Sequence, residues 1–158
     1  MPLIFVTSRH ASFYNDLPNQ KLYCLVGNEA KRLKRNISDR NFNGVCILPP
    51  YPRLMGTEVP SYAEYSAFEL SEITFTESFP DSCTTVALQT ALSLGAKEVY
   101  VVGYDGYKGE VLSEKEMALS NENKILFDDF KNKGCNEIIS LTPSLYKNLD
   151  VISIYQYL

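Results

Sequence analysis

The chain has 158 residues, of which 45% are hydrophobic and 22% are charged, and its formal net charge is −4. This length suits one domain spanning residues 1–158, and the composition indicates neither a disordered tail nor a fibrous protein. The acidic balance argues against nucleic acid as a partner, because binding to a phosphate backbone depends on clustered Lys and Arg.

The N-terminal part predicts strands separated by short helices. Apolar, β-branched runs at residues 3–7, 22–26 and 45–48 are typical of strands that are buried on both faces. Residues 11–17 and 29–35 predict helices between these strands.

The middle of the chain is expected to be less regular. Residues 49–60 contain four prolines and a glycine. Because neither a helix nor a central strand tolerates this composition, we expect a structured loop. Residues 62–70 weakly favour a helix, and residues 73–75 favour a short strand.

A strong local pattern begins at Asp81. Either Asp81 or Ser82 can cap a helix over residues 84–94, and Gly95 is suited to end it. Residues 97–105 then predict a strand.

A second helix is expected after this strand. Ser113 and Glu116 have the spacing of a capping box, and Gly134 suits a left-handed stop after Lys133. A strand over residues 137–142 should follow. The final segment, residues 151–158, predicts either an edge strand or a tail that docks on a partner.

The alternation of strands and helices predicts the α/β class. Parallel strands need a crossover, which a helix usually provides. We therefore expect about five mostly parallel strands in one central sheet, with helices on both faces in a doubly wound arrangement.

The cysteines and the N-terminal sequence bear on location. The four cysteines are widely spaced without a C-x-x-C pair, which indicates reduced thiols. The opening MPLIFV lacks the basic segment of a signal peptide, and no stretch approaches a membrane span. We therefore expect a cytoplasmic protein with no membrane partner.

In an open parallel sheet, ligands bind outside the carboxyl ends of the strands. This rule selects polar and aromatic residues that follow predicted strands or begin a helix. The expected ligand-binding residues are Asn28, Glu29, Arg53, Asp81, Ser82, Thr84, Thr85, Tyr104, Asp105 and Tyr107.

Two of these groups have both a binding and a structural interpretation. The hydroxyls and free backbone N–H groups at residues 81–85 suit a phosphate or carboxylate at a helix N-terminus, or else Ser82 simply caps the helix. Asp105 suits a ligand hydroxyl, ribose or amine, or else it stabilises the turn that Gly106 permits.

Several familiar catalytic and cofactor-binding motifs are missing from the sequence. There is no G-x-G-x-x-G after a strand, no P-loop, no G-x-S-x-G and no zinc-ligand cluster. His10 is the only histidine. We therefore expect no metal site and no complete catalytic set, and the sequence leaves the cofactor unknown.

Two segments resemble a known family. The first is LVGNEAKRL, and the second is DSCTTVALQTALSLGAKEVYVVGYDGY, which continues into SEKEMALSNENKILF and IISLTPSLYK. Both resemble the C-terminal domain of certain bacterial proteins of the 4-hydroxy-2-oxovalerate aldolase and HMG-CoA-lyase-like (DRE-TIM type) group. The resemblance runs from about Leu22 onward.

The resemblance implies a Rossmann-like accessory domain, a three-layer sandwich without assigned catalytic residues. In that group the aldol chemistry and its divalent metal belong to a separate TIM barrel, and none of that barrel is present in this sequence. The implied partner is such an aldolase barrel.

A more distant similarity, confined to residues 81–107, exists to 6-hydroxymethylpterin diphosphokinase-like and sialyltransferase-like domains. It implies a nucleotide beside a helix N-terminus. The glycine-rich opening of those enzymes is replaced here by Thr7, Ser8 and Arg9.

Three functions follow as hypotheses. The first is an accessory or regulatory domain of an aldolase-type protein that binds an anionic small molecule such as a nucleotide or sugar phosphate. The second is a nucleotide-dependent transferase that uses Asp105 or Glu29 as a base or metal ligand. The third is an assembly module that forms a homodimer or docks the barrel through its tyrosine-rich loops and apolar C-terminus.

Overall fold

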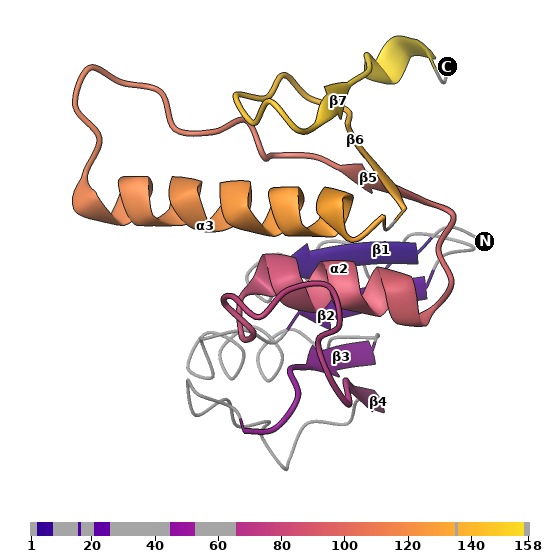
Figure 1. Ribbon diagram of the computed structural model, residues 1–158. Helices are drawn as coiled ribbons and strands as arrows, with labels where there is room; N and C mark the ends of the chain where they lie inside the picture. Colours follow the sequence, from indigo (N-terminus) through magenta and orange to yellow (C-terminus); the bar gives the residue numbers. More distant parts are fainter. Residues whose placement is uncertain are drawn as a thin grey trace. The chain divides into compact units, whose positions relative to one another are not determined.

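The computed structural model describes residues 3–7, 16, 21–25, 45–52, 66–134 and 136–156. These residues form an α/β structure in which every strand pairing is parallel, so the α/β class is confirmed (Figure 1). The strands form two sheets instead of the single sheet of about five that the sequence predicted.

The chain divides into two compact units. The first contains Met1–Thr74 and Pro80–Thr90, and the second contains Phe75–Phe79 and Ala91–Leu158. Each unit has its own parallel sheet. One domain over residues 1–158 stays a prediction.

The sheet of the first unit has four strands, and their order in the sheet follows the chain: β1-β2-β3-β4. Residue partners are in register, as Cys24 with Cys46 and Ile47 with Phe68 illustrate. The strand bounds are β1 Leu3–Thr7, β2 Lys21–Leu25, β3 Val45–Leu48 and β4 Ser66–Glu69.

The core of the first unit lies where β3 meets helix α2, Cys83–Ser93. Ile47, Leu70 and Val86 are buried together, and Ala87 packs against them. Burial of these apolar side chains holds the helix onto the strand.

Helix α2 has the ends that the sequence predicted. The Ser82 hydroxyl accepts a hydrogen bond from the backbone N–H of Thr84 at 3.3 Å, so Ser82 is the cap. At the other end Gly95 has a φ of +67°, and its N–H donates to the carbonyl of Leu92.

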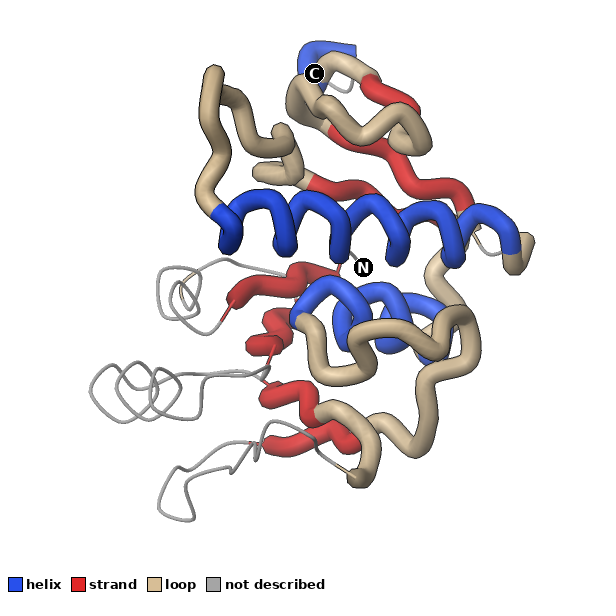
Figure 2. The backbone as a smooth tube through the Cα atoms, turned by 60° about the vertical axis from the view of Figure 1, so that its left-hand side comes forward, coloured by secondary structure: helices blue, strands red, loops and turns tan. Residues whose placement is uncertain are grey.

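The second unit holds a three-stranded sheet in the order β5-β6-β7. Its strands are β5 Glu98–Val101, β6 Glu137–Ser140 and β7 Asp150–Val151. The connection from β5 to β6 is the helix α3, Glu114–Asn132, which makes a βαβ crossover. Figure 2 shows α3 running alongside these strands.

Helix α3 begins and ends as its sequence signals predict. Ser113 and Glu116 form the complete capping box, and the N–H of Gly134, with φ +64°, donates to the carbonyl of Lys131. Its core residues are Leu126, Phe127 and Phe130. The ring of Phe130 lies 5.3 Å from that of Phe75 in an edge-to-face arrangement.

Two sequence predictions in the middle of the chain are wrong. Residues 66–69 form strand β4 where a weak helix was expected, because pairing with β3 overrides a weak local preference. Residues 73–75 are not a strand. The Thr74 N–H donates to the side chain of Gln89 at 2.8 Å, so it takes part in no strand ladder.

The chain ends differ in part from expectation. The predicted strand over residues 97–105 is shorter, and the segment after β7 forms a 3₁₀ turn at Ile154–Gln156. The helices expected at residues 11–17 and 29–35 and the loop after residue 52 lie outside the described residues. Among the described residues, no helix has the length and apolar character needed to cross a membrane.

Candidate functional site

The carboxyl ends of β5 and β6 meet at one edge of the second sheet, because the two strands are parallel neighbours. Residues 102–113 follow β5, and residues 141–149 follow β6. These two loops therefore bring together side chains that are about forty positions apart, as the 40-residue separation of Tyr104 and Ser144 shows.

Thr142 joins the two loops at Asp105. Its hydroxyl donates a hydrogen bond of 2.9 Å to the Asp105 carboxylate and accepts one of 3.3 Å from the N–H of Gly103. A backbone hydrogen bond also joins the two loops, since the Leu145 N–H donates to the Asp105 carbonyl at 2.9 Å. Asp105 is thus held in place while its side chain stays exposed to solvent.

Ser144 joins the loops a second time. Its hydroxyl donates to the Tyr104 carbonyl at 2.6 Å and accepts from the Tyr146 N–H at 3.2 Å. The Ser140 hydroxyl also donates to the Thr142 carbonyl at 2.7 Å. Side-chain hydrogen bonds of this kind fix irregular backbone that no strand ladder supports.

Gly106 allows the loops to approach closely. Its φ is +86°, and a Cβ atom at this position would lie 2.9 Å from the Cβ of Leu145. Both the backbone conformation and the lack of space require glycine here. The role of the Asp105 carboxylate, in the turn or in ligand binding, stays a prediction.

Aromatic rings form the wall between these loops and α3. The Phe127 ring lies edge-to-face between Tyr104, at 5.2 Å, and Tyr146, at 5.5 Å. The Tyr146 hydroxyl accepts a hydrogen bond of 3.3 Å from the Asn123 side chain. These contacts orient the rings and keep Phe127 and Tyr146 buried.

The surroundings of Tyr107 disfavour ionisation of its hydroxyl. Burial raises the pKa of Tyr107 above its ordinary value, and the nearby Tyr146, Glu116 and Glu122 raise it further. At neutral pH this side chain is a hydrogen-bond donor and not an anion.

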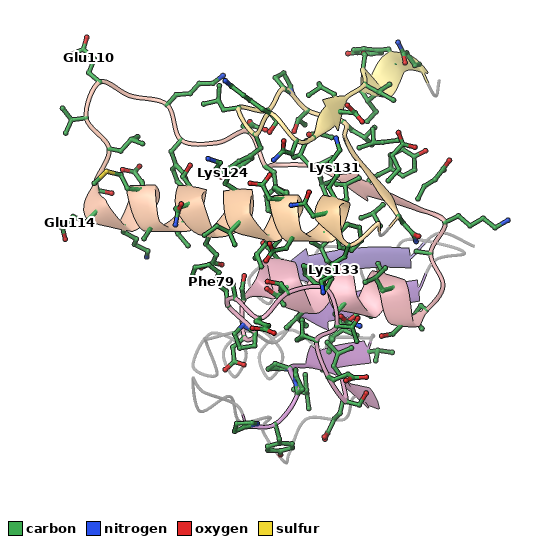
Figure 3. All side chains as sticks on the ribbon, in the orientation of Figure 1. Phe79, Glu110, Glu114, Lys124, Lys131 and Lys133 are labelled. Carbon is green, nitrogen blue, oxygen red and sulfur yellow. The ribbon has the colours of Figure 1, made fainter. Side chains whose placement is uncertain are left out.

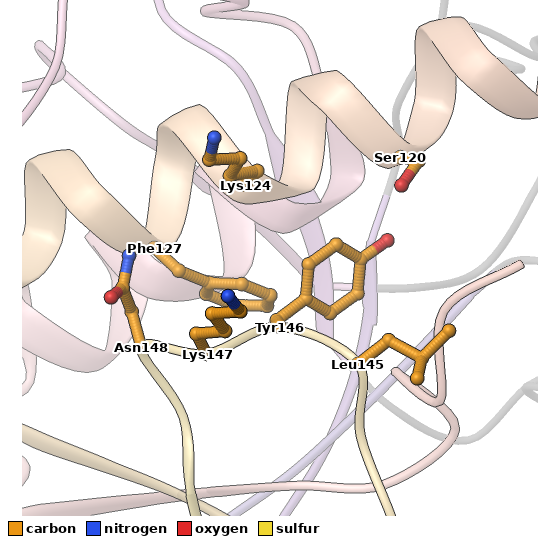
Figure 4. Close-up of a pocket in the computed structure, with 7 residues that line it drawn as sticks. All are labelled: Ser120, Lys124, Phe127, Leu145, Tyr146, Lys147 and Asn148. Atoms are coloured by element: carbon orange, nitrogen blue, oxygen red, sulfur yellow. The ribbon is translucent and has the colours of Figure 1, made fainter.

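A cavity of about 360 Å³ opens between α3 and the loop after β6 (Figure 4). Its lining combines a buried aromatic surface with polar groups around it. The lining residues are Ser120, Lys124, Phe127, Leu145, Tyr146, Lys147 and Asn148.

Two lysines line this cavity from different elements. Lys124 extends from α3 and Lys147 from the loop (Figure 4). Within the described part of the chain, neither lysine has a carboxylate partner. An anionic group in the cavity would supply that partner.

The predicted site residues of the first unit are positioned mainly by the start of α2. Ser82 caps the helix, and its backbone carbonyl accepts from the Val86 N–H at 2.9 Å. Asp81, Thr84 and Thr85 are buried there, with exposed fractions of 5%, 6% and 0%. The capping interpretation is supported for Ser82, while a bound anion at this helix start stays a prediction.

The structure brings only part of the predicted site together. Tyr104, Asp105 and Tyr107 share one loop of the second unit, and residues 81–85 belong to the first unit. Asn28, Glu29 and Arg53 lie outside the described residues. Their part in ligand binding stays a prediction.

Several site residues were missed by the sequence analysis. Thr142 ends the predicted strand of residues 137–142 and Ser144 lies two positions after it, so the same carboxyl-end rule points to them. Lys124 and Lys147 carry no such signal, because lysine on a helix or loop is usually a solvated charge. Only the cavity distinguishes them.

Within the described ranges, no three His, Cys, Asp or Glu side chains come together in the arrangement that a metal ion would need. Comparisons with protein-family models, with curated proteins and with solved structures found no match to this chain. The resemblance to aldolase-associated domains therefore stays a prediction.

Proposed function

We propose that this chain binds an anionic small molecule in the cavity between α3 and the loop after β6. The observation that carries the proposal is the position of Lys124 and Lys147 at this cavity without carboxylate partners among the described residues. Lysine side chains in this setting attract phosphate or carboxylate groups.

The rest of the lining supports specific recognition. Phe127 and Tyr146 form a buried surface that limits water around a bound group, which strengthens charge interactions. Ser120 and Asn148 add hydrogen-bonding groups at the rim. A mostly preformed cavity with a few polar groups is the usual form of a small-molecule site.

The loops that carry Asp105 form the adjoining wall of this site. Tyr146 lines the cavity and is linked through Ser144 to Tyr104, the residue before Asp105. We propose that Asp105 and the protonated Tyr107 contribute hydrogen bonds to ligand hydroxyl groups near this wall.

The wider context is proposed from the sequence resemblance. The chain would be a Rossmann-like accessory domain, a three-layer sandwich around a mostly parallel sheet, which serves an aldolase-type barrel in the cytoplasm. Parallel pairing throughout and the β5–α3–β6 crossover are compatible with that fold. Co-purification with an aldolase barrel encoded beside this chain would test the partner.

The binding proposal is tested by calorimetry with inorganic phosphate and pyrophosphate. We expect Lys124→Ala and Lys147→Ala each to weaken binding about fivefold, corresponding to about 1 kcal/mol for a partly exposed charge. Lys115→Ala is the matched control, because it removes the same charge from the same helix away from the cavity. No binding by the wild type, or full binding by the double variant, would refute the proposal.

An assembly role is the second candidate function. The apolar side chains near the C-terminus are exposed, with Val151 at 51%, Ile154 at 48% and Tyr155 at 80%. Exposed apolar groups close together are typical of interaction surfaces. Sedimentation that shows a strictly monomeric chain at high concentration would exclude a homodimer.

The transferase hypothesis has no such support. Two carboxylates converging with the start of the Ser82 helix would favour it, and Glu29 lies outside the described residues. The Asp105 carboxylate accepts a hydrogen bond from the Thr142 hydroxyl. This bond does not by itself indicate that Asp105 acts as a base or a metal ligand.

A further inference from the structure

A second cavity, of about 280 Å³, adjoins the first. The two cavities share Phe127 and Asn148 as lining residues, so they adjoin, and the two together are called the groove. The second part lies toward the end of α3 and the beginning of β6. Its remaining lining residues are Phe130, Lys131, Asn136, Glu137, Ile138 and Asp150.

The groove follows one face of α3. Ser120, Lys124, Phe127 and Lys131 recur at the spacing that places residues on a single helix face. With a rise of 1.5 Å per residue, this face extends about 16 Å from Ser120 to Lys131. Figure 3 shows Lys124 and Lys131 on the same side of the helix.

The two ends of the groove differ in charge. The first end carries the cations Lys124 and Lys147. The second end carries the carboxylates of Glu137 and Asp150 with only Lys131 as a cation, and both carboxylates are exposed. A simple anion would use the first end alone, whereas the second end suits hydroxyl or amine donors.

The aromatic rings argue against a nucleotide. The two cavities, of about 360 and 280 Å³, have the size of a small-molecule site. Phe127 and Tyr146 are only 2% and 7% exposed and already pack edge-to-face with each other. They offer little free ring surface on which a base would stack.

From these observations we infer that the groove binds a monosaccharide phosphate, with the phosphate between Lys124 and Lys147 and the sugar hydroxyl or amine groups at Glu137 and Asp150. This inference rests on the proposed anion-binding function and adds the class of ligand. Asn148, which lines both cavities, lies at the junction of the phosphate and sugar parts.

The test compares ligands by calorimetry on the full chain. The probes are inorganic phosphate, glucose 6-phosphate, ribose 5-phosphate, glucosamine 6-phosphate and AMP. We expect at least one sugar phosphate to bind about tenfold tighter than inorganic phosphate, since hydrogen bonds to charged groups are stronger than neutral ones. AMP should bind no tighter than inorganic phosphate.

Variants separate the two ends of the groove. The double variant Glu137→Gln/Asp150→Asn should reduce the affinity for that sugar phosphate toward the value for inorganic phosphate and leave phosphate binding unchanged. Glu110→Gln is the matched control, since this acidic residue lies in the loop after β5 and lines neither cavity. It should change neither affinity.

The outcomes distinguish this inference from the proposed function. If phosphate binds through the two lysines but no sugar phosphate binds tighter, the anion site stands and the sugar-phosphate inference is wrong. Tighter binding of AMP, or an unchanged affinity in the double variant, would also overturn the inference. If none of the phosphate compounds binds, both proposals fail.

Discussion

The Thr142 hydroxyl donates a hydrogen bond of 2.9 Å to the Asp105 carboxylate, across a sequence separation of 37 residues. This bond connects the loops that follow two neighbouring parallel strands, at the edge where α/β proteins bind ligands. The position of Asp105 therefore depends on a residue in a different loop.

Replacing Thr142 with Val should lower the free energy of unfolding by about 1 kcal/mol, because the shape is kept while the hydrogen bonds of the hydroxyl to Asp105 and from the Gly103 N–H are lost. Urea unfolding of Thr142→Val, Asp105→Ala and the double variant forms a complete cycle. Strict additivity of the two single losses would show that the hydrogen bond contributes nothing to stability.

Gly106→Ala should destabilise the protein by about 3 kcal/mol, since it combines an unfavourable left-handed backbone with a clash against Leu145. Gly95→Ala is the control for the backbone term, because Gly95 also has a positive φ but nothing lies within 4 Å of an added Cβ. It should cost about 1 kcal/mol. Leu145→Ala keeps the Cβ that makes the closest contact, so it should restore little of the stability lost in Gly106→Ala. Equal losses at the two glycines would contradict the proposed clash.

Ser113→Ala should remove the cap of α3 and cost about 1 kcal/mol in the free energy of unfolding. The Ser113 hydroxyl accepts from the Glu116 N–H at 3.3 Å, and this bond cannot form in the variant. Ser113→Thr, which keeps a hydroxyl, should retain most of the stability. A wild-type value for Ser113→Ala in thermal and urea unfolding would show that the cap is unimportant.

The capping box also predicts a pH dependence. The hydrogen bonds from the Ser113 side chain and backbone lower the pKa of Glu116 from its ordinary 4.5. A carboxyl whose pKa is lower in the folded state stabilises that state at pH values above its ordinary pKa. This contribution is lost as the pH falls through the pKa of the folded state. The wild type should therefore lose more stability on acidification than Glu116→Gln. An acid profile of Glu116→Gln identical to that of the wild type would contradict this role of Glu116.

Tyr107 should ionise above the ordinary tyrosine pKa of 10.0, since burial and the nearby Tyr146, Glu116 and Glu122 disfavour its anion. NMR titration with tyrosine labelled at Cζ resolves it from the other tyrosines, and Tyr107→Phe assigns the signal. Because the raised folded pKa favours the protonated folded state, stability should decrease as pH rises through this range. In Glu122→Gln the pKa of Tyr107 should move back toward 10.0, and an unchanged pKa would remove Glu122 as a cause.

The helices were the most predictable part of the fold. Ser113, Glu116 and Gly134 specify the ends of α3 through contacts within one or two turns, and Ser82 and Gly95 do the same for α2. Such signals are local, so the sequence contains them directly. The strands were harder, because β4 exists through its pairing with β3 and its residues alone favoured a weak helix.

The candidate site was also predictable only where its signals are local in the sequence. Position after a strand was enough to select Tyr104, Asp105 and Tyr107, since the carboxyl-end rule needs only the order of elements along the chain. The hydrogen bond from Thr142, the fit of Gly106 against Leu145 and the cavity beside Lys124 and Lys147 join residues that are distant in sequence.

By itself, the sequence determined the α/β class and the limits of both described helices, because these depend on periodicity and on capping contacts between near neighbours. The tertiary structure alone decided which side chains meet at the edge of β5 and β6, and which lysines border a cavity. The physical reason is that packing and parallel pairing act between distant segments, and their partners appear only when the chain is folded.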